Sequence, residues 1–382
     1  MTILFLLFFF TTILSISSTS SSQINASNTT TLHRRLTLFG SCGTGNPVDD
    51  CWRSDPRWAD NRRRLADCGI GFGRNAIGGK NGPTYVVTDP SDDDPSSPAP
   101  GTLRYGLTQD GPLWIVFAHD MTIRPKHELV VGSHKTVDGR GAQVVVGEGG
   151  ACFAVDGASN VIIHGVTIRG CRPKPRGPRG RSESDGDGVS VCEARDVWID
   201  RCSFEDCADG LVDVTRASTG VTVSNSLFTN HDKAMLLGHS DSFDDDRAMR
   251  VTVTLNRFGP GLVQRMPRCR YGVFHVVNND YVKWGMYAIG GSASPNILSL
   301  GNRFSAGHNK EVTKREDDMA ENDWRNWRWK SVGDLMLNGA FFTASGGPGP
   351  EVNAPSFAKS ASMVEQMTAE AGALSCNRDS LC

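Results

Sequence analysis

The sequence lacks several features that would place a chain of 382 residues in a familiar class at once. The apolar run at residues 3–14 is shorter than the roughly 20 residues that a membrane-spanning helix needs, so we expect no membrane span. Excess positive charge is also missing, because the formal net charge is -2, which argues against a general nucleic-acid binder. Neither His239 nor His275 has a second histidine at ligand spacing, and we interpret both as packed or hydrogen-bonded side chains rather than metal ligands.

The first residues indicate export instead. Residues 1–22 combine a short apolar run with a following stretch of small residues, as a secretory signal peptide does, although a basic segment before the run is missing. Two glycosylation acceptors follow at Asn25 and Asn28, which have a use only in a secreted protein. We therefore expect a secreted, extracellular protein whose residues 23–45 form a polar, glycosylated N-terminal segment.

Eleven cysteines are consistent with an oxidising compartment, where most of them should pair. Proximity along the chain favours three disulfides, namely Cys51–Cys68, Cys152–Cys171 and Cys376–Cys382. Four others lie on or beside strand-like segments, where a buried free cysteine packs as a small apolar residue. These four are Cys192, Cys202, Cys207 and Cys269. Because the count is odd, at least one thiol stays unpaired or pairs between chains.

A loosely regular repeat runs through the middle of the chain. Each unit is a short alternating apolar run followed by a polar or small residue and then an aromatic one, and the units recur at steps of roughly 22 to 36 residues. The runs begin at Val161, Val197, Val221, Val251, Phe274 and Asn296. Helix-period segments of useful length do not separate them, so alternating strand and helix units are disfavoured. The pattern predicts an all-β fold, a parallel β-helix in which each coil covers the apolar face of the previous one; a β-sandwich is the competing interpretation.

The repeat defines the expected domain organisation. We predict a β-helix domain over residues 46–344, followed by a linker and a C-terminal tail over residues 345–382. The linker is rich in glycine and proline, and the tail contains a weakly helical stretch at about 356–374 and a closing cysteine pair. Such a tail could cover one end of the solenoid, which would otherwise expose apolar surface.

Several long strings within these coils resemble the plant pectate lyase family, polysaccharide lyases that include pollen allergens. Two of them are Asp185-Gly186-Asp187-Gly188 and the stretch from Gln264 to Arg270. The remaining strings occupy residues 46–47, 51–53, 66–68, 84–90, 100–104, 138–141, 208–213, 235–241 and 287–292. This resemblance implies a right-handed parallel β-helix that cleaves de-esterified pectin, a (1,4)-α-D-galacturonan, by calcium-dependent elimination. It implies a monomer that acts on pectate in the cell wall.

The acidic residues of these strings form a candidate calcium site. Asp209 and Asp213 are four residues apart at one coil edge, and Asp185 and Asp187 are two apart, a spacing that keeps both on one face of a strand. Carboxylate oxygens are the ligands that Ca²⁺ prefers. By resemblance the ligands are Asp185, Asp209 and Asp213, with Asp187 contributing directly or through water. Asp-Gly pairs also favour ordinary turns, which is the alternative for any single pair.

By resemblance, Arg265 occupies the position of the catalytic base, and Lys233 and Arg270 occupy positions that bind substrate carboxylates. Elimination removes the proton on C5 of a galacturonate unit, which lies next to the carboxylate, while the oxygen on C4 departs. A guanidinium is normally protonated, so Arg265 can act as a base only where nearby positive charge and preorganised geometry favour deprotonation. For Arg268, the sequence leaves a surface charge at a turn and a functional role equally open.

Two local features leave questions open. The family commonly has histidine where Arg201 stands, so Arg201 puts the efficiency of catalysis in doubt if that histidine supports the calcium region. The basic run from Arg172 to Arg181 either steers a polyanion electrostatically or is simply a solvated surface loop.

Two other functions stay open. One is a polygalacturonase-like hydrolase that uses paired carboxylates, and the other is a pectate-binding wall protein with weakened turnover.

Overall fold

The computed structural model describes residues 43–176, 183–316, 319–346, 353–377 and 380–382. The predicted signal peptide, both glycosylation acceptors, Cys42 and part of the basic run therefore lie outside the described residues. Gly43 to Cys382 form one compact unit. Among the described residues, no helix is long and apolar enough to span a membrane.

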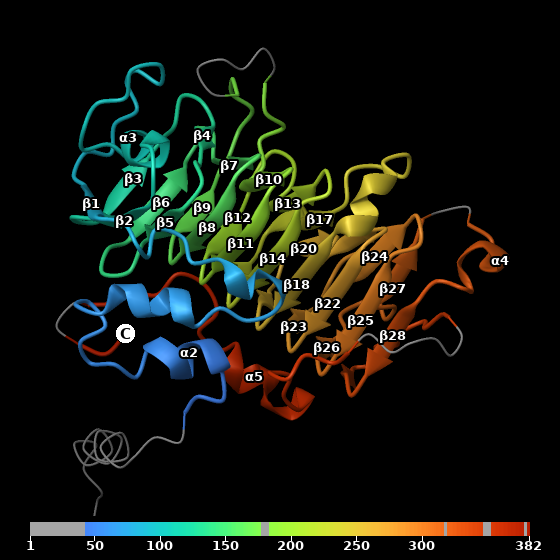
Figure 1. Ribbon diagram of the computed structural model, residues 1–382. Coiled ribbons are helices and arrows are strands. Elements are labelled where there is room, and N and C mark those ends of the chain that lie inside the picture. The colour runs from blue at the N-terminus through green and yellow to red at the C-terminus, as the bar shows by residue number, and fades with distance from the viewer. Residues whose placement is uncertain (1–42, 177–182, 317–318, 347–352, 378–379) are drawn as a thin grey trace, which may run out of the picture. The chain divides into compact units, whose positions relative to one another are not determined.

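The chain winds through three parallel sheets, whose strands stack coil upon coil (Figure 1). In the described residues the ten-stranded sheet contains β1 (Thr84–Val87), β2 (Leu113–Phe117), β5 (Lys135–Asp138), β8 (Ser159–His164), β11 (Arg195–Asp200), β14 (Thr219–Ser224), β18 (Arg250–Thr254), β22 (Val273–Val277), β25 (Asn296–Leu300) and β28 (Trp329–Val332). The nine-stranded sheet contains β3 (Met121–Ile123), β6 (Val144–Gly147), β9 (Thr167–Arg169), β12 (Ser203–Glu205), β15 (Leu227–Phe228), β19 (Arg257–Phe258), β23 (Asp280–Val282), β26 (Arg303–Ser305) and β29 (Leu335–Leu337).

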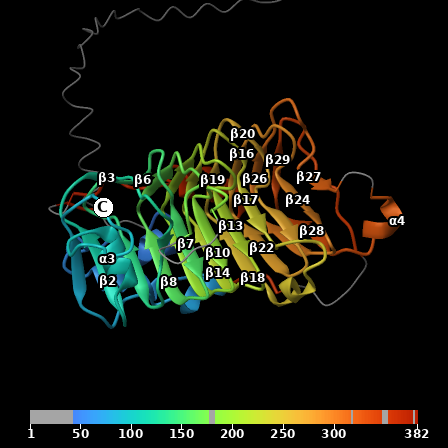
Figure 2. The same cartoon turned by 90° about the horizontal axis from the view of Figure 1, so that it is seen from above.

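The third sheet of the described part has eight strands and carries the residues discussed below as a site. It contains β4 (Leu129–Val130), β7 (Phe153–Asp156), β10 (Val189–Cys192), β13 (Val212–Thr215), β17 (Met235–Leu237), β21 (Arg268–Arg270), β24 (Ile289–Ser292) and β27 (Thr313–Arg315). A short pair, β16 (His231–Lys233) and β20 (Leu262–Gln264), lies beside it. Every strand pair within these sheets is parallel, and Figure 2 shows the stacked coils from above. The predicted right-handed parallel β-helix is therefore confirmed, and the β-sandwich is excluded.

Helical segments are short and lie outside the coils. The α-helices are α2 (Pro47–Trp52), α3 (Leu103–Thr108), α4 (Glu321–Trp324) and α5 (Val364–Met367). The 3₁₀ turns are η1 (Arg62–Asp67), η2 (Phe72–Asn75), η3 (Asp244–Ala248) and η4 (Ala361–Met363). The predicted weak helix of the tail is thus reduced to η4 and α5.

Stacked aromatic rings fill part of the interior. Phe204, Phe228, Phe258, Tyr281 and Phe304 come from successive strands of the nine-stranded sheet and stack with ring centroids 4.6 to 5.0 Å apart. All five are buried. These are the aromatic residues that close the repeat units in the sequence, and their stacking explains why the repeat demands a ring at that place.

Buried asparagines form a second ladder at the corner before the nine-stranded sheet. Asn256, Asn279 and Asn302 are fully buried, and each side-chain oxygen accepts a hydrogen bond from the backbone N–H at the equivalent corner of the previous coil. Their amide groups donate to carbonyls of Val223, Val253 and Val276 respectively. Because the corner interrupts the backbone ladder, these side chains satisfy polar groups that would otherwise be buried without partners.

The N-terminal segment covers the outer face of the ten-stranded sheet. Val48, Trp52 and Trp58 are buried against Trp114 and Trp198 of that sheet. The predicted disulfide Cys51–Cys68 closes this segment. The other two predicted disulfides, Cys152–Cys171 and Cys376–Cys382, also form, and the four cysteines expected to be free are free.

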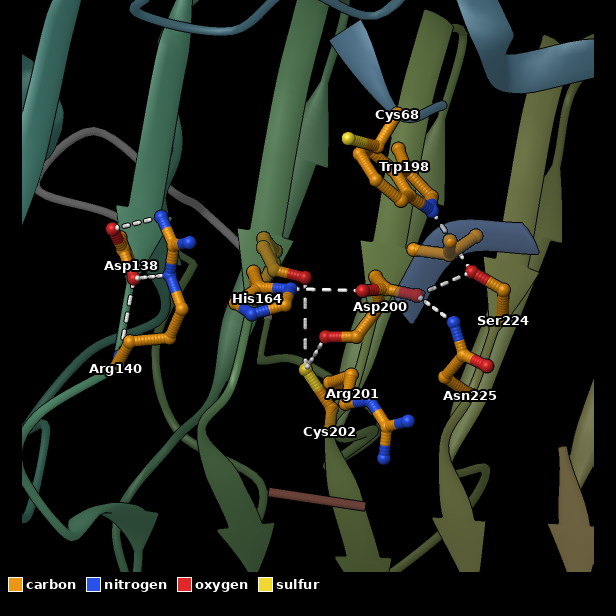
Figure 3. Close-up of polar contacts among 12 residues, drawn as sticks. Cys68, Asp138, Arg140, His164, Trp198, Asp200, Arg201, Cys202, Ser224 and Asn225 are labelled. Carbon is orange, nitrogen blue, oxygen red and sulfur yellow. Dashed lines mark hydrogen bonds and ion pairs between the residues drawn. The ribbon is translucent and has the colours of Figure 1, made fainter. Parts of the chain in front are cut away.

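Buried charges lie between this segment and the sheet (Figure 3). Asp138 accepts hydrogen bonds from Arg140, and His164 contacts Asp200 at 2.8 Å. Arg201 is 1% exposed and binds the carboxylate of Asp49 in α2, with its Nε 3.1 Å from Oδ1. It also donates to the carbonyl of Glu370 in the tail. Arg201 therefore joins the two terminal segments to the coils, and these contacts give it a structural role.

The C-terminal tail runs along the side of the solenoid, so the expectation that it covers an end is wrong. Asn278 exchanges two hydrogen bonds with the backbone of Lys359, and the Gly372 N–H donates to the carbonyl of Asn225 two coils earlier. The tail ends beside the N-terminal segment, where Arg53 donates to the carbonyl of Cys382 and Trp58 to that of Ser380. Polar coil corners offer the tail backbone partners that an apolar solenoid end would not.

We predict that Asn279→Ala lowers the free energy of unfolding by about 2 kcal/mol or more, because the buried N–H of Asn256 and the buried carbonyl of Val253, both on the preceding coil, lose their partner. Asn296→Ala is the control, since Asn296 is partly exposed and makes one hydrogen bond of 3.4 Å. Its effect should stay within about 0.5 kcal/mol. Urea unfolding followed by circular dichroism measures both, and equal losses would contradict the role of the asparagine ladder.

Candidate active site

The candidate site lies on the outer face of the eight-stranded sheet and on the turns that lead into its strands. Along β13, Val212 and Val214 point into the core, so Asp213 between them points outward. In register, Asp213 is flanked by Ser190 on β10 and Leu236 on β17, and Leu236 by Arg268 on β21. The parallel ladder thus aligns side chains from four coils in one row.

Three of the four predicted calcium ligands come together at the start of this row. A Cβ atom placed on Gly210 would lie 2.2 Å from Oδ1 of Asp213 and 3.2 Å from Oδ1 of Asp187, so both carboxylates crowd one glycine. The N–H of Gly210 donates to Oδ1 of Asp187 at 2.8 Å. Only a residue without a side chain fits here, which explains the glycine of the Asp209-Gly210 pair.

These carboxylates repel one another. Burial, followed by the charges of Asp187 and Asp209, raises the pKa of Asp213 well above its usual value, and Arg265 opposes the shift. Burial and the neighbouring Asp209 and Asp185 raise the pKa of Asp187 to about 6. The cluster therefore carries negative charge that the surrounding protein compensates only in part.

The remaining acidic contacts are ion pairs. Asp209 accepts a hydrogen bond of 3.0 Å from Nζ of Lys233, which lies on β16. Asp185 is exposed and lies 3.7 Å from Arg176 of the basic run. In the part of the chain that the structure describes, no three His, Cys, Asp or Glu side chains form a group that could hold a metal ion as they stand. The donors are nonetheless all carboxylate oxygens, the chemistry that a hard cation such as Ca²⁺ requires.

Arg265 occupies the turn between β20 and β21, next to the acidic cluster. Its φ of +62° is left-handed, a conformation that a non-glycine residue adopts only when its surroundings hold it. Neighbouring coils supply that support, because the Arg265 carbonyl accepts from Met235 N–H and the next N–H, of Met266, donates to Ala288. Its Nε is buried without a hydrogen-bond partner. Burial raises the pKa of nearby Tyr287, and the positive charges of Arg268 and Arg265 oppose this rise.

Arg268 and Arg270 point outward from the same strand, on either side of buried Cys269. Arg268 pairs with Glu316 and donates to Oγ of Ser292 at 3.3 Å. Arg270 pairs with Asp241 at 2.7 Å. Arg268 is therefore a fixed member of a polar network rather than a free surface charge.

The structure adds Asp241, Tyr287, Ser292 and Glu316 to the predicted site. Asp241 and Ser292 fall within strings that resemble the family, yet nothing in their local sequence shows which arginine they contact. They meet the predicted residues only because the coils stack, since Ser292 pairs in register with Arg270 across one coil. The sequence therefore marked Asp241 and Ser292 as members of family-like strings, but only the fold shows that they contact each other and Arg270.

The chain is similar to known proteins over most of its length. A family model described as pectate lyase matches residues 119–373. The chain is 53% identical over 393 residues to a pectate lyase of Zinnia elegans, covering 97% of this chain and 96% of that protein. It is 55% identical over 369 residues to a protein named probable pectate lyase 22 of Arabidopsis thaliana, covering 92% of this chain and 84% of that one.

Two solved structures share the fold. The crystal structure of Jun a 1, the major allergen from cedar pollen, aligns with a TM-score of 0.83 and 45% identity, covering 86% of this chain and 99% of that one. A mutant of Bacillus subtilis pectate lyase aligns with a TM-score of 0.59 at 19% identity, covering 81% of this chain and 97% of that one, which shows a shared fold.

The raised pKa of Asp187 predicts a pH dependence of stability in the presence of a chelator. An aspartate in the unfolded chain titrates near 3.9, so between about pH 4 and pH 6 the folded protein holds the extra proton and stability falls as pH rises. Asp187→Asn keeps a side-chain oxygen that accepts from the Gly210 N–H. The variant should lose on the order of 1 to 3 kcal/mol less free energy of unfolding than the wild type over this pH range. Urea unfolding at pH 4.5 and pH 6.5 measures the difference, and parallel profiles for both proteins would show that Asp187 titrates normally.

Proposed function

This chain belongs to the pectate lyase family, and we propose that it cleaves (1,4)-α-D-galacturonan by calcium-dependent β-elimination. The observation that carries the proposal is the meeting of carboxylates and cations on one sheet face. Asp187, Asp209 and Asp213 lie there beside Lys233 and Arg265. We further propose that it acts as a secreted monomer in the cell wall.

The proposed reaction breaks the bond between C4 and the glycosidic oxygen. Arg265 removes the proton on C5, the electron pair forms the C4=C5 double bond, and the departing oxygen takes up a proton from solvent. The fixed left-handed turn supports this role, because a base must be held within hydrogen-bond reach of the proton that it removes. The unpartnered Nε leaves part of the guanidinium without a protein acceptor.

We propose that calcium is held by Asp185, Asp209 and Asp213, with Asp187 contributing directly or through water. The mutual repulsion that raises the pKa of Asp213 supports this assignment, since a divalent cation would relieve it. As Asp209 is paired with Lys233, it must turn toward the cation, and Lys233 is then free for a substrate carboxylate. When bound, calcium would neutralise the uronate carboxylate and thereby make the C5 proton more acidic.

The surrounding face suits a long polyanion. Two hollows flank the charged cluster on the same sheet, one of about 250 Å³ lined by Ala154, Ser190 and neighbours, the other of about 80 Å³ lined by Arg268, Tyr287 and neighbours. From β7 to β24 the sheet crosses five strand spacings, or about 24 Å, enough for several sugar units. Arg176 of the basic run lines the first hollow. We therefore propose that the basic run attracts the polyanionic substrate electrostatically.

Two alternatives have less support. A polygalacturonase-like hydrolase would use two carboxylates and would not need calcium, whereas here Arg265 acts on the acidic cluster, and the relatives are named pectate lyases. The hypothesis of a binding protein with weakened turnover depends on Arg201. The partners of Arg201, Asp49 and Glu370, lie in the terminal segments. The assay separates all three, since only elimination yields an unsaturated product that absorbs in the ultraviolet.

We predict that Asp209→Asn together with Asp213→Asn abolishes calcium-stimulated cleavage of polygalacturonate, because the amides keep the shape but remove the charge that binds calcium. Calorimetry should show that calcium binding is lost, while the thermal transition in excess chelator stays within a few degrees of wild type. Asp232→Asn on β16, whose carboxylate is exposed, is the control and should retain both properties. Full calcium-stimulated activity in the double variant would remove these residues from the metal site.

We predict that Arg265→Lys lowers turnover at saturating substrate by about two orders of magnitude or more, because an ammonium places its nitrogen elsewhere in the site. Calcium-dependent binding of a short oligogalacturonate should survive, since Arg270 and Lys233 remain. Arg257→Lys on the nine-stranded sheet is the matched control and should behave as wild type. Turnover of Arg265→Lys within about threefold of wild type would refute the base assignment, and parallel loss of binding would make Arg265 a substrate clamp.

A further inference from the structure

The guanidinium of Arg270 is held along one side by the protein itself. Its Nε donates to Oδ1 of Asp241 at 2.7 Å, and its Nη1 donates to the carbonyls of Gly238 and His239 at 3.0 and 3.3 Å. The Arg270 side chain is only 14% exposed. Among the described residues, Nη2 donates no hydrogen bond to the protein, so this nitrogen keeps its donors available.

The Asp241 carboxylate, which accepts from Arg270, has a second hydrogen-bond partner. The hydroxyl of Ser292 donates to the same oxygen, Oδ1, at 2.6 Å, and Ser292 lies beside Arg270 in register on β24. Partial burial works against ionisation, but the hydrogen bonds from Ser292 and Arg270 hold the pKa of Asp241 below its usual value. Arg268 reaches the other side of Ser292, so one chain of contacts joins Arg268, Ser292, Asp241 and Arg270.

The loop that carries Asp241 is anchored independently of Arg270. Asp246, fully buried in η3, accepts from the N–H of Ala217 at 2.7 Å and from that of His239 at 2.5 Å. The hydroxyl of Tyr271 donates to the Asp241 carbonyl, and Arg247 covers the Tyr271 ring at 4.7 Å. The Asp241 carboxylate is therefore presented to Arg270 from a fixed backbone.

Gly238 shows how closely this loop is fitted to Arg270. Its φ is +117°, and a Cβ atom there would lie 2.6 Å from Cβ of Arg270. A side chain at this position would displace the arginine, whereas glycine lets the backbone carbonyl approach its Nη1. Loop and arginine thus form one preorganised unit.

From these contacts we propose that Asp241 is a positioning residue, which acts through Arg270 by fixing its guanidinium so that the Nη2 edge meets a substrate carboxylate. Arginine loses considerable side-chain entropy when it is ordered, and a guanidinium oriented before substrate arrives loses less on binding. Ser292 assists by holding the acceptor oxygen in place. This inference rests on the proposed function only in identifying the bound group as the carboxylate of a galacturonate unit.

The test is a double-mutant cycle on polygalacturonate with calcium. Asp241→Ala should raise KM about tenfold or more and change kcat less, because binding of a carboxylate by Arg270 is weakened. Arg270→Ala should raise KM at least as much. In the Arg270→Ala background, adding Asp241→Ala should change KM by less than about twofold, since Asp241 has lost the group through which it acts.

Graded and matched variants complete the design. Asp241→Asn, whose amide oxygen still accepts from Nε, should fall between wild type and Asp241→Ala. Asp244→Asn on the same loop is the control, because Asp244 is exposed and its contact with Arg247 is 3.9 Å long. A KM for Asp241→Ala equal to that of wild type, or effects of the two alanine variants that simply add, would overturn the inference.

A second measurement does not depend on activity. In nitrogen-15 NMR spectra, the Nε–H of Arg270 should exchange slowly with water in the wild type and in Asp244→Asn, and quickly in Asp241→Ala. Slow exchange that persists in Asp241→Ala would overturn the inference. If the wild type shows the expected exchange but does not cleave polygalacturonate with calcium, the proposed function fails while the positioning of Arg270 by Asp241 stands.

Discussion

The parallel hydrogen-bond ladder between successive coils is the interaction on which everything else in this molecule depends. It holds each residue beside the residue one coil away, so a row of equivalent positions becomes a row of touching side chains. Inside, the row that runs from Phe204 to Phe304 becomes a stack of rings. Outside, the same rule brings Asp213 and Arg268 into one line, although they are far apart in sequence.

A solenoid built this way separates stability from chemistry. The buried rings pack the interior of each coil, and the buried asparagines hydrogen-bond its backbone groups. The outer face of the eight-stranded sheet, in contrast, holds charged groups that destabilise one another. Asp187 and Asp209 are held close enough to Asp213 to raise its pKa, and Arg265 has a left-handed backbone. Such unfavourable arrangements persist because the neighbouring coils fix them, as is common at functional sites.

The sequence was sufficient to predict whatever repeats or lies close along the chain. The period of the apolar runs, the closing aromatic residues and the three disulfides could all be read from it, and the resemblance to a known family located Arg265 and the aspartates. It was insufficient for contacts between residues that share no local pattern. The pairing of Arg201 with Asp49, or of Arg270 with Asp241, depends on which coil corners become neighbours. The course of the tail was mispredicted for the same reason, because its partners are single asparagines at separate corners.

The contact between the two terminal segments changes how the solenoid can come apart. A stack of coils in which each touches only its neighbours can fray from either end, one unit at a time. Here Arg53 and Trp58 bind the carbonyls of Cys382 and Ser380, Asn278 binds Lys359, and Arg201 binds both segments. The two described terminal segments together span several coils, so a coil cannot detach unless their contacts open first. Unfolding of the coils that they span is thereby made cooperative, and a protease would find few partly opened coils to attack.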